Sequence, residues 1–155
     1  MRAVAARGVR AGAVRLPPTT QGAGDHGFVP ILNAIARRKG VSAYLGEGLN
    51  RWPATHRADA AQVFRLALEE GAAGGTYHAV AEEGLLFREI AEAIGRGLNL
   101  PVVSLPPEEA AGHFDWFAMF ASADIPATAE RTRQRLGWAP TKPALLADMA
   151  EHYFG

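Results

Sequence analysis

The chain has 155 residues and no formal net charge, because 16 Lys and Arg balance 16 Asp and Glu, and 48% of it is hydrophobic. This length allows one compact unit with a real core and is too short for two full domains. Neutrality gives no electrostatic basis for binding nucleic acid or an anionic membrane. No apolar run approaches the ~20 residues that span a bilayer. Cysteine is absent, which excludes disulfides, a thiolate nucleophile and zinc–cysteine sites.

The first 24 residues contain four arginines and no acid. This pattern superficially resembles an organelle presequence. We favour another interpretation, the end of a surface helix that runs into a buried strand, because the AGAVRL segment at 11–16 already has strand character. We therefore expect a cytoplasmic protein.

The first predicted strand covers residues 9–16 and stops at Pro17-Pro18, which removes two ladder donors in succession. A polar, glycine-rich loop follows over residues 19–27. A helix then begins near Phe28 and ends at Gly40, and residues 41–45 form a short strand.

The clearest predicted helix covers residues 59–70. Its apolar side chains have the i, i+3, i+4 spacing of one buried stripe, namely Ala60, Val63, Phe64, Ala67 and Leu68. We expect Val63, Phe64 and Leu68 to be buried, at roughly 1.5–3 kcal/mol each. Asp59 is expected to cap the first turn.

The remaining elements alternate between strand and helix before the chain ends in helices. They are a strand at 76–80, a helix over 87–98, a strand at 101–105, a helix with Pro107 at its first position that carries Phe114, Phe117 and Ala121, and tail helices around 136–138 and 145–154. Such alternation predicts an α/β fold with parallel strand pairing.

The segment from Gly22 to Gly27 matches the dinucleotide-binding pattern G-x-G-x-x-G, with Glu47 20 residues further on. In that motif the first glycine lies at the carboxyl end of a strand. Residues 17–21 separate Gly22 from the predicted strand, so we favour a loop whose glycines and Asp25 serve turn geometry or substrate contact. Nucleotide binding by this loop remains the alternative.

The sequence contains no other strong catalytic or metal-binding motif. The five histidines have no metal-ligand spacing, and G-x-S-x-G is absent, so we predict no metal site and no hydrolytic nucleophile. In the loop before the clearest helix, Arg51 could clamp an anionic or carbonyl group and Trp52 could wall an apolar pocket. Equally, Arg51 could be solvated and Trp52 a packing residue. We expect His56 to be buried and hydrogen-bonded.

Four segments, in order, resemble the extended and atypical short-chain dehydrogenases/reductases of the NAD-dependent epimerase/dehydratase branch. The first resembles the family's R-x-P turn after its sixth strand. The others resemble its G-x-G … V-H-V-D-D-V-A segment, the strand that follows this segment, and the family's L-G-[WF]-x-P motif near the C-terminus. They are the segments 15–22, 46–48 together with 55–61, 76–80 and 135–140.

The resemblance implies a fold class and a division of the chain. The class is α/β, with the C-terminal part of a Rossmann-type parallel sheet and a small, mostly helical substrate-binding region. The chain would be a single unit over 1–155, in which the last Rossmann strands and helices (about 1–20 and 55–80) are joined to substrate-binding segments (about 21–54 and 81–155).

It also implies site residues, all expected to contact NAD or NADP or a small-molecule substrate. The turn of Pro17, Pro18 and Thr19 would pass beside the nicotinamide. The substrate-binding residues would be Asp25, His26, Phe28, Asn50, Arg51 and Trp52. Ala60 replaces the second aspartate of the D-D pattern, and this departure leaves the substrate class open.

The family's catalytic parts do not occur in the sequence. The cofactor motif T-G-x-x-G-x-x-G is absent, and none of the three tyrosines has a lysine four residues on. Without that pair hydride transfer has no proton donor, so we assign no catalytic residue. We expect the substrate-binding half of an NAD(P)-dependent oxidoreductase or epimerase, inactive alone, which forms a homo-oligomer or joins an N-terminal half. The alternative is a non-catalytic nucleotide-binding or protein-interaction module.

Overall fold

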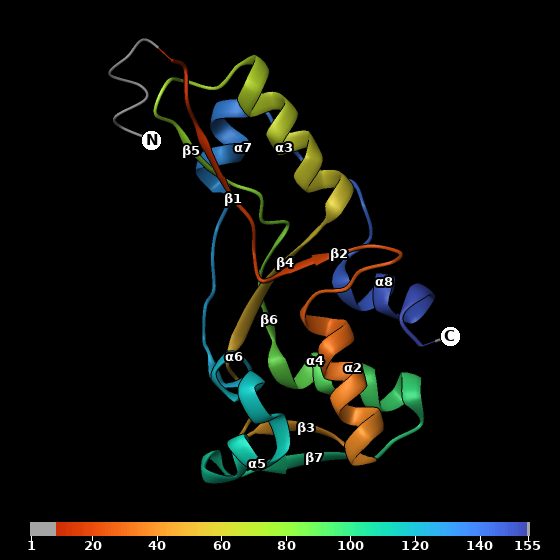
Figure 1. Cartoon of the computed structure of the whole chain (residues 1–155). Coiled ribbons are helices and arrows are strands. Elements are labelled where there is room, and N and C mark those ends of the chain that lie inside the picture. Colours follow the sequence, from red (N-terminus) through yellow and green to blue (C-terminus); the bar gives the residue numbers. More distant parts are fainter. Residues whose placement is uncertain (1–8, 155) are drawn as a thin grey trace.

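The structure is a computed structural model that describes residues 9–154 (Figure 1). The surface helix end expected before Val9 lies outside these residues. The strands are β1 (Ala13–Arg15), β2 (Thr19–Gln21), β3 (Ser42–Leu45), β4 (Arg51–His56), β5 (Thr76–His78), β6 (Glu82–Leu86) and β7 (Val102–Leu105). The helices are α2 (Phe28–Lys39), α3 (Arg57–Glu69), α4 (Phe87–Leu98), α5 (Ala110–Phe114), α6 (Ala118–Ser122), α7 (Glu130–Leu136) and α8 (Leu145–His152), with short 3-10 turns at Pro107–Glu109 and Asp115–Phe117.

The strands form three small sheets. β1 pairs in parallel with β5, and β3 pairs in parallel with β7. The third sheet has the order β2-β4-β6, in which β2 runs parallel and β6 antiparallel to β4. The predicted α/β class with parallel pairing is confirmed. Within residues 9–154 no helix has the length and apolar character needed to cross a membrane.

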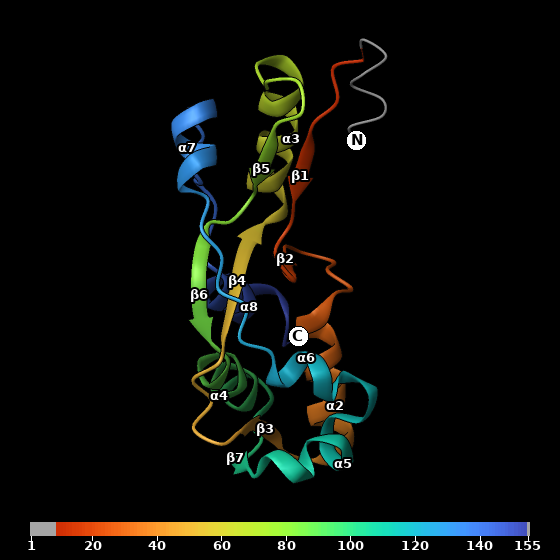
Figure 2. The ribbon, with the colours of Figure 1, turned by 90° about the vertical axis from the view of Figure 1, so that its left-hand side faces the viewer.

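The buried side chains of the described residues form two clusters. Most of the elements that carry them lie towards opposite ends of the molecule in Figure 2. The larger one joins α2, α4 and the aromatic residues of α5 and its neighbours, with Trp52 inside it. The smaller one joins α3 and β5 to the α7 segment through Val63, Tyr77 and Trp138. The chain therefore packs a helical region at one end and a β1–β5–α3 layer at the other.

Helix α3 corrects two expectations. Phe64 and Leu68 are not buried, since they are 50% and 74% exposed, and of the three large side chains expected in the core only Val63 is fully enclosed. The stripe is real, but within residues 9–154 no element covers its outer half. Asp59 does not cap the helix either, because the cap is His56, whose Nδ1 accepts from the Ala58 N–H at 3.1 Å.

Asp59 instead fixes the segment that follows α7. Its carboxylate is fully buried and accepts from the backbone N–H groups of Thr141 and Lys142, both at 3.0 Å. The indole N–H of Trp138 donates to the Asp59 carbonyl at 3.1 Å. Asp59 thus ties the L-G-W-x-P segment to the start of α3.

The other differences concern short elements. Helices α2 and α4 agree closely with their predictions, whereas β2, β4 and β6 were not predicted as strands. The helix expected after Pro107 is broken into short pieces, in which Asp115 has a positive φ of 56°. The predicted strand at 9–16 shortens to β1.

Candidate functional site

The expected cofactor turn follows the carboxyl end of β1. The side chains of Pro17 and Thr19 are buried, Pro18 is half-buried, and Thr19 opens β2 opposite Ala54. In open α/β sheets ligands bind beyond the carboxyl ends of the parallel strands. The turn therefore lies at the edge where a ligand is expected, and Pro18 is its most exposed residue.

The glycine loop lies closer to a strand than its sequence suggested. Because β2 ends at Gln21, Gly22 follows a strand directly, and the loop leads into α2 at Phe28. The objection that residues 17–21 separate the motif from its strand is therefore wrong. A different feature opposes phosphate binding, since the Asp25 carboxylate accepts from the Gly27 N–H at 2.7 Å. It places negative charge at the helix end that would hold the pyrophosphate.

The loop is also tied to the end of the chain. The Tyr153 hydroxyl donates to Asp25 Oδ2 at 2.8 Å and accepts from the Gly22 N–H at 3.3 Å. Burial raises the pKa of Tyr153, and the negative charges of Asp25 and Asp148 raise it further against the opposing effect of the Gly22 bond. Tyr153 therefore stays protonated and holds the loop closed against α8.

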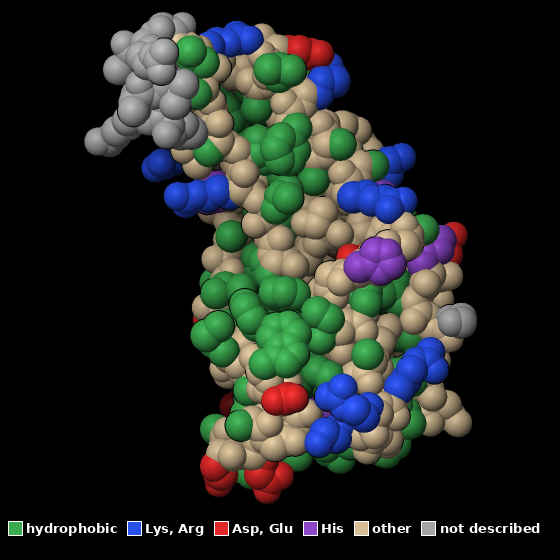
Figure 3. Space-filling model, viewed as in Figure 1, with side chains coloured by type: hydrophobic (Ala, Val, Ile, Leu, Met, Phe, Trp, Pro, Cys, Tyr) green, Lys and Arg blue, Asp and Glu red, His purple; other side chains and the backbone are tan. Residues whose placement is uncertain are grey.

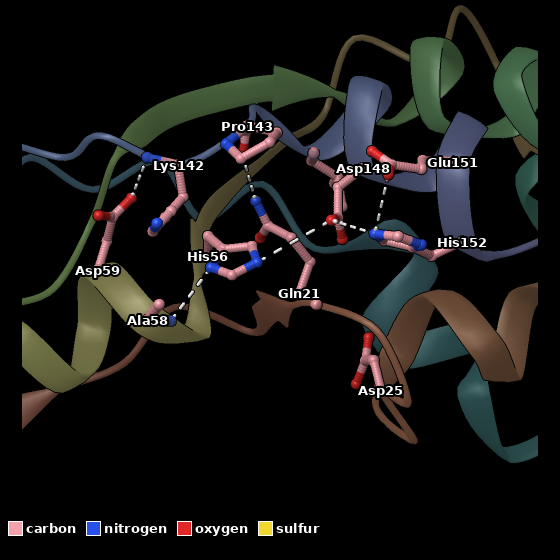
Figure 4. A network of polar contacts seen from close by, with 12 residues as sticks. Gln21, Asp25, His56, Ala58, Asp59, Lys142, Pro143, Asp148, Glu151 and His152 are labelled. Carbon is pink, nitrogen blue, oxygen red and sulfur yellow. Dashed lines mark hydrogen bonds and ion pairs between the residues drawn. The ribbon is translucent and has the colours of Figure 1, made fainter.

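Beside this contact lies the polar network drawn in Figure 4. The buried Asp148 carboxylate of α8 faces His56 Nε2 at 4.0 Å and His152 Nε2 at 3.8 Å. Gln21 Nε2 donates to the Pro143 carbonyl at 3.4 Å. Because Asp148 is almost fully enclosed, we interpret the network as a structural link between α8, β2 and β4 and not as a reaction centre.

The predicted substrate residues Asn50 and Arg51 lie where the chain enters β4, and both bind other parts of this chain. Asn50 donates through Nδ2 to the carbonyls of Ala121 and Ala123, at 3.0 and 3.1 Å. The Arg51 guanidinium makes a bidentate contact with Asp124, through Nε at 3.0 Å and Nη2 at 2.9 Å. Asn50 and Arg51 hold the end of α6 and the segment that follows it in place. Arg51 is therefore already paired and is not a free clamp for an anion.

Trp52 is fully buried at the centre of an aromatic cluster. Its ring lies 5.6 Å from that of Phe28 and 6.0 Å from that of Phe117, and Phe28 lies 4.8 Å from Phe120. Of the two open interpretations, packing describes Trp52. Phe28 is partly exposed and joins the core to the surface. His26 is exposed in the glycine loop.

Three residues at the surface of this cluster were not predicted. Trp116 and Met119 are 63% and 69% exposed, and Phe120 is half-buried against Trp116. The sequence contains a pattern that indicates exposed apolar residues here. The segment DWFAMF is apolar on more than one face, whereas an ordinary surface helix has one apolar stripe. Figure 3 shows hydrophobic side chains gathered over the α6 region.

The ion pair of Arg51 gives a testable pH effect. Its hydrogen bonds hold the pKa of Asp124 below the ordinary value of that carboxyl. A carboxylate with a lowered pKa stabilises the fold above its unfolded pKa and loses this contribution as the pH falls through the folded value. Both side chains are exposed, so the stability effect is small. Arg51→Ala is expected to raise the pKa of Asp124, measured by carboxyl ¹³C NMR titration.

The matched control is Arg65→Ala, which removes the exposed pair with Glu69 on α3. It should leave the Asp124 titration unchanged. An Asp124 pKa that does not move in Arg51→Ala would contradict the pairing.

No group of three or more His, Asp or Glu suited to a metal ion occurs among residues 9–154.

Comparison with known proteins gives two long relatives and many similar folds. The chain is 55% identical over 151 residues to an uncharacterized protein of Schizosaccharomyces pombe, covering 97% of this chain and 51% of that protein. It is 47% identical over 147 residues to an uncharacterized protein of Saccharomyces cerevisiae, covering 95% and 49%. The chain thus spans about half the length of the curated relatives it matches. No family model matches the chain.

The similar solved structures share the fold at low identity. The dTDP-glucose 4,6-dehydratase of Streptomyces venezuelae, solved with NAD, has a TM-score of 0.69 at 18% identity. The match covers 94% of this chain and 43% of the dehydratase chain. The RMD protein of Pseudomonas aeruginosa, complexed with NADPH, has a TM-score of 0.64 at 17%, with coverages of 97% and 51%. UDP-glucose 4-epimerase of Thermotoga maritima has a TM-score of 0.63 at 16%, with coverages of 92% and 44%. The fold therefore matches part of the Rossmann-like fold of these dehydratase and epimerase structures.

Proposed function

We propose that the chain is the substrate-binding half of an NAD(P)-dependent oxidoreductase or epimerase of the short-chain dehydrogenase type, and that it works with a cofactor-binding half. The second half, in the same or another polypeptide, would carry the glycine-rich motif and the Tyr-x-x-x-Lys pair. Three observations support this: the fold neighbours, relatives of twice the length, and an uncovered apolar face on α3. The last of these carries the proposal.

That face combines an open strand edge with exposed apolar groups. Among the described residues β1 pairs with β5 alone, so its other edge has no partner strand. Beside that edge lies a hollow of about 480 Å³, lined by Val14, Phe64 and Leu68 among others. Unpaired edges of parallel sheets and contiguous apolar patches are features that proteins normally cover. A neighbouring strand and helix of a Rossmann half would cover both.

The residues that would meet the cofactor fit a supporting role. Bound NAD(P) would supply the hydride acceptor or donor. Pro18, the half-buried residue of the turn, would flank the nicotinamide at the carboxyl end of β1, with Pro17 and Thr19 packed behind it. The buried side chains of Pro17 and Thr19 hold this turn in shape. The proton donor would come from the other half, so we expect no NAD(P)H turnover by the chain alone.

A binding experiment tests the proposal. The chain is mixed with the part of the Schizosaccharomyces pombe relative that lies outside the matched region, and association is followed by sedimentation velocity. We expect a one-to-one complex that binds NADH or NADPH in a fluorescence titration. The double variant Phe64→Asp, Leu68→Asp should weaken association at least about tenfold, because it places two charges against a buried apolar face.

The matched control is Leu49→Asp, at a comparably exposed leucine before β4. It should leave association unchanged. Equal effects of the two sets of variants, or no complex at all, would refute the docking face. Submicromolar binding of NADH by the chain alone would instead favour the alternative, a nucleotide-binding module at residues 22–27.

A further inference from the structure

A hollow of about 310 Å³ lies between the glycine loop, α2 and the end of α8. Gly24 and Asp25 line it from the loop, and His152 and Tyr153 line it from the end of α8 and the residue that follows. The loop comes directly after the carboxyl end of β2, which runs parallel to β4. Ligands of open α/β sheets bind beyond the carboxyl ends of the strands. The docking face on β1 and α3 does not use this hollow.

One wall of the hollow is a single face of α2. Four side chains with the i, i+3, i+4, i+7 spacing of one helix face line it, namely Pro30, Asn33, Ala34 and Arg37. Seven residues of an α-helix rise by about 10 Å. The hollow is therefore a short groove with the small side chain of Ala34 near its middle, and we call it the α2 groove.

The two ends of the α2 groove have opposite charges. Asp25 lies before the N-terminal end of α2, and its two carboxylate oxygens already accept from the Gly27 N–H and the Tyr153 hydroxyl. Arg37 lies in the last turn of α2, is exposed, and forms no ion pair among residues 9–154. The groove therefore has one open charged position, a guanidinium that can bind a carboxylate through two parallel N–H groups.

The rest of the α2 groove is rich in hydrogen-bond acceptors. Asn33 is 7% exposed and donates through Nδ2 to the Tyr153 carbonyl at 3.1 Å, while its Oδ1 has no partner among the described residues. His152 Nε2 lies 3.8 Å from both Asp148 Oδ1 and Glu151 Oε1 (Figure 4). A buried acceptor without a donor is costly. These acceptors favour ligand hydroxyl groups, which can donate, over a second anionic group.

We propose that the α2 groove binds a small polyhydroxylated carboxylate, with the carboxylate on Arg37 and the hydroxyl groups towards Asn33 and Asp25. Arg37 fixes the charged end of the ligand, and the acceptors at the other end select hydroxyl groups. The negative charge of Asp25 repels a diphosphate, which would need a cation at both ends of the groove. The inference goes beyond the proposed function, because the groove requires neither the cofactor nor the second half.

Three six-carbon probes separate the two parts of this recognition. Gluconate has both the carboxylate and the hydroxyl groups, hexanoate has only the carboxylate, and sorbitol has only the hydroxyl groups. In ¹H–¹⁵N spectra of the labelled chain at constant ionic strength, gluconate should shift the amide signals of Gly24 and Ala34 saturably, with a Kd on the order of 1 mM for so small a ligand. Hexanoate and sorbitol should bind at least about tenfold more weakly. The amide of Gly71, in the hollow of the docking face, is the internal control.

Substitutions on α2 test the position of the ligand. Arg37→Gln keeps a polar side chain without the charge and should weaken gluconate binding at least about tenfold. Arg38→Gln is the matched control, since Arg38 is the next residue of α2 and does not line the groove. It should change the Kd less than about twofold. Ala34→Phe fills the groove from an exposed helix position and should abolish the Gly24 shift without changing the circular dichroism spectrum.

Several results would overturn the proposal. They are gluconate that shifts neither signal, gluconate that binds Arg37→Gln as well as it binds the unsubstituted chain, and hexanoate or sorbitol that binds as tightly as gluconate. The double variant Phe64→Asp, Leu68→Asp should bind gluconate with unchanged affinity. Failure of the groove is therefore distinguishable from failure of the docking face.

Discussion

Replacing Trp52 with alanine is expected to lower the free energy of unfolding by about 4 kcal/mol, the loss that is typical of a large aromatic side chain removed from a core. The ring is fully buried and packs against Phe28, Phe87 and Phe117. The cavity would open where the helical region meets β4. Urea denaturation followed by circular dichroism measures the change.

The matched variant is Trp116→Ala, which removes the same side chain from the surface. Because Trp116 is 63% exposed, its loss should cost less than about 1 kcal/mol. Trp52→Phe should cost less than Trp52→Ala, since it keeps an aromatic ring and removes an indole N–H that has no partner among the described residues. Equal losses for Trp52→Ala and Trp116→Ala would contradict this division into a buried core ring and an exposed surface ring.

Asp59→Ala is expected to lower the free energy of unfolding by about 3 kcal/mol. The variant removes a fully buried carboxylate and leaves the N–H groups of Thr141 and Lys142 without their acceptor. Hydrogen bonds to a charged group contribute about 1.5–3 kcal/mol each in stability measurements, and their contributions overlap at one site. The segment that carries Trp138 would lose its attachment to α3.

Asp59→Asn provides a graded comparison, because its amide keeps one acceptor oxygen and should lose roughly half as much. Asp124→Ala is the surface control and should change stability little. A helix cap at Asp59 would have cost only about 1 kcal/mol. A loss of that size in Asp59→Ala would therefore indicate that the contacts to residues 141 and 142 are unimportant.

Much of the fold could be predicted from the sequence because it is local. The spacing of Phe87, Ile90, Ala91 and Ile94 sets the buried face of α4, and Gly40 ends α2 in the left-handed conformation. Such signals require only a few neighbouring residues. The α/β class followed from the alternation of these elements.

The candidate site was predicted less well, because its contacts join distant parts of the chain. Nothing near Arg51 in the sequence indicates that Asp124 will pair with it, or that Tyr153 will reach Asp25. The three-residue strand β2 is too short for a hydrophobic pattern, so only its pairing with β4 makes it a strand. The cofactor turn and the substrate role of His26 remain predictions.

The sequence by itself determined where α2, α3 and α4 lie, which face of each is apolar, and that a Tyr-x-x-x-Lys pair does not occur in these 155 residues. The tertiary structure decided which apolar faces are covered. Val63 and Phe64 are neighbours on one stripe, yet the first is enclosed and the second is half exposed. The reason is physical: periodicity fixes the direction of a side chain along its helix, whereas burial also requires a second element packed against it.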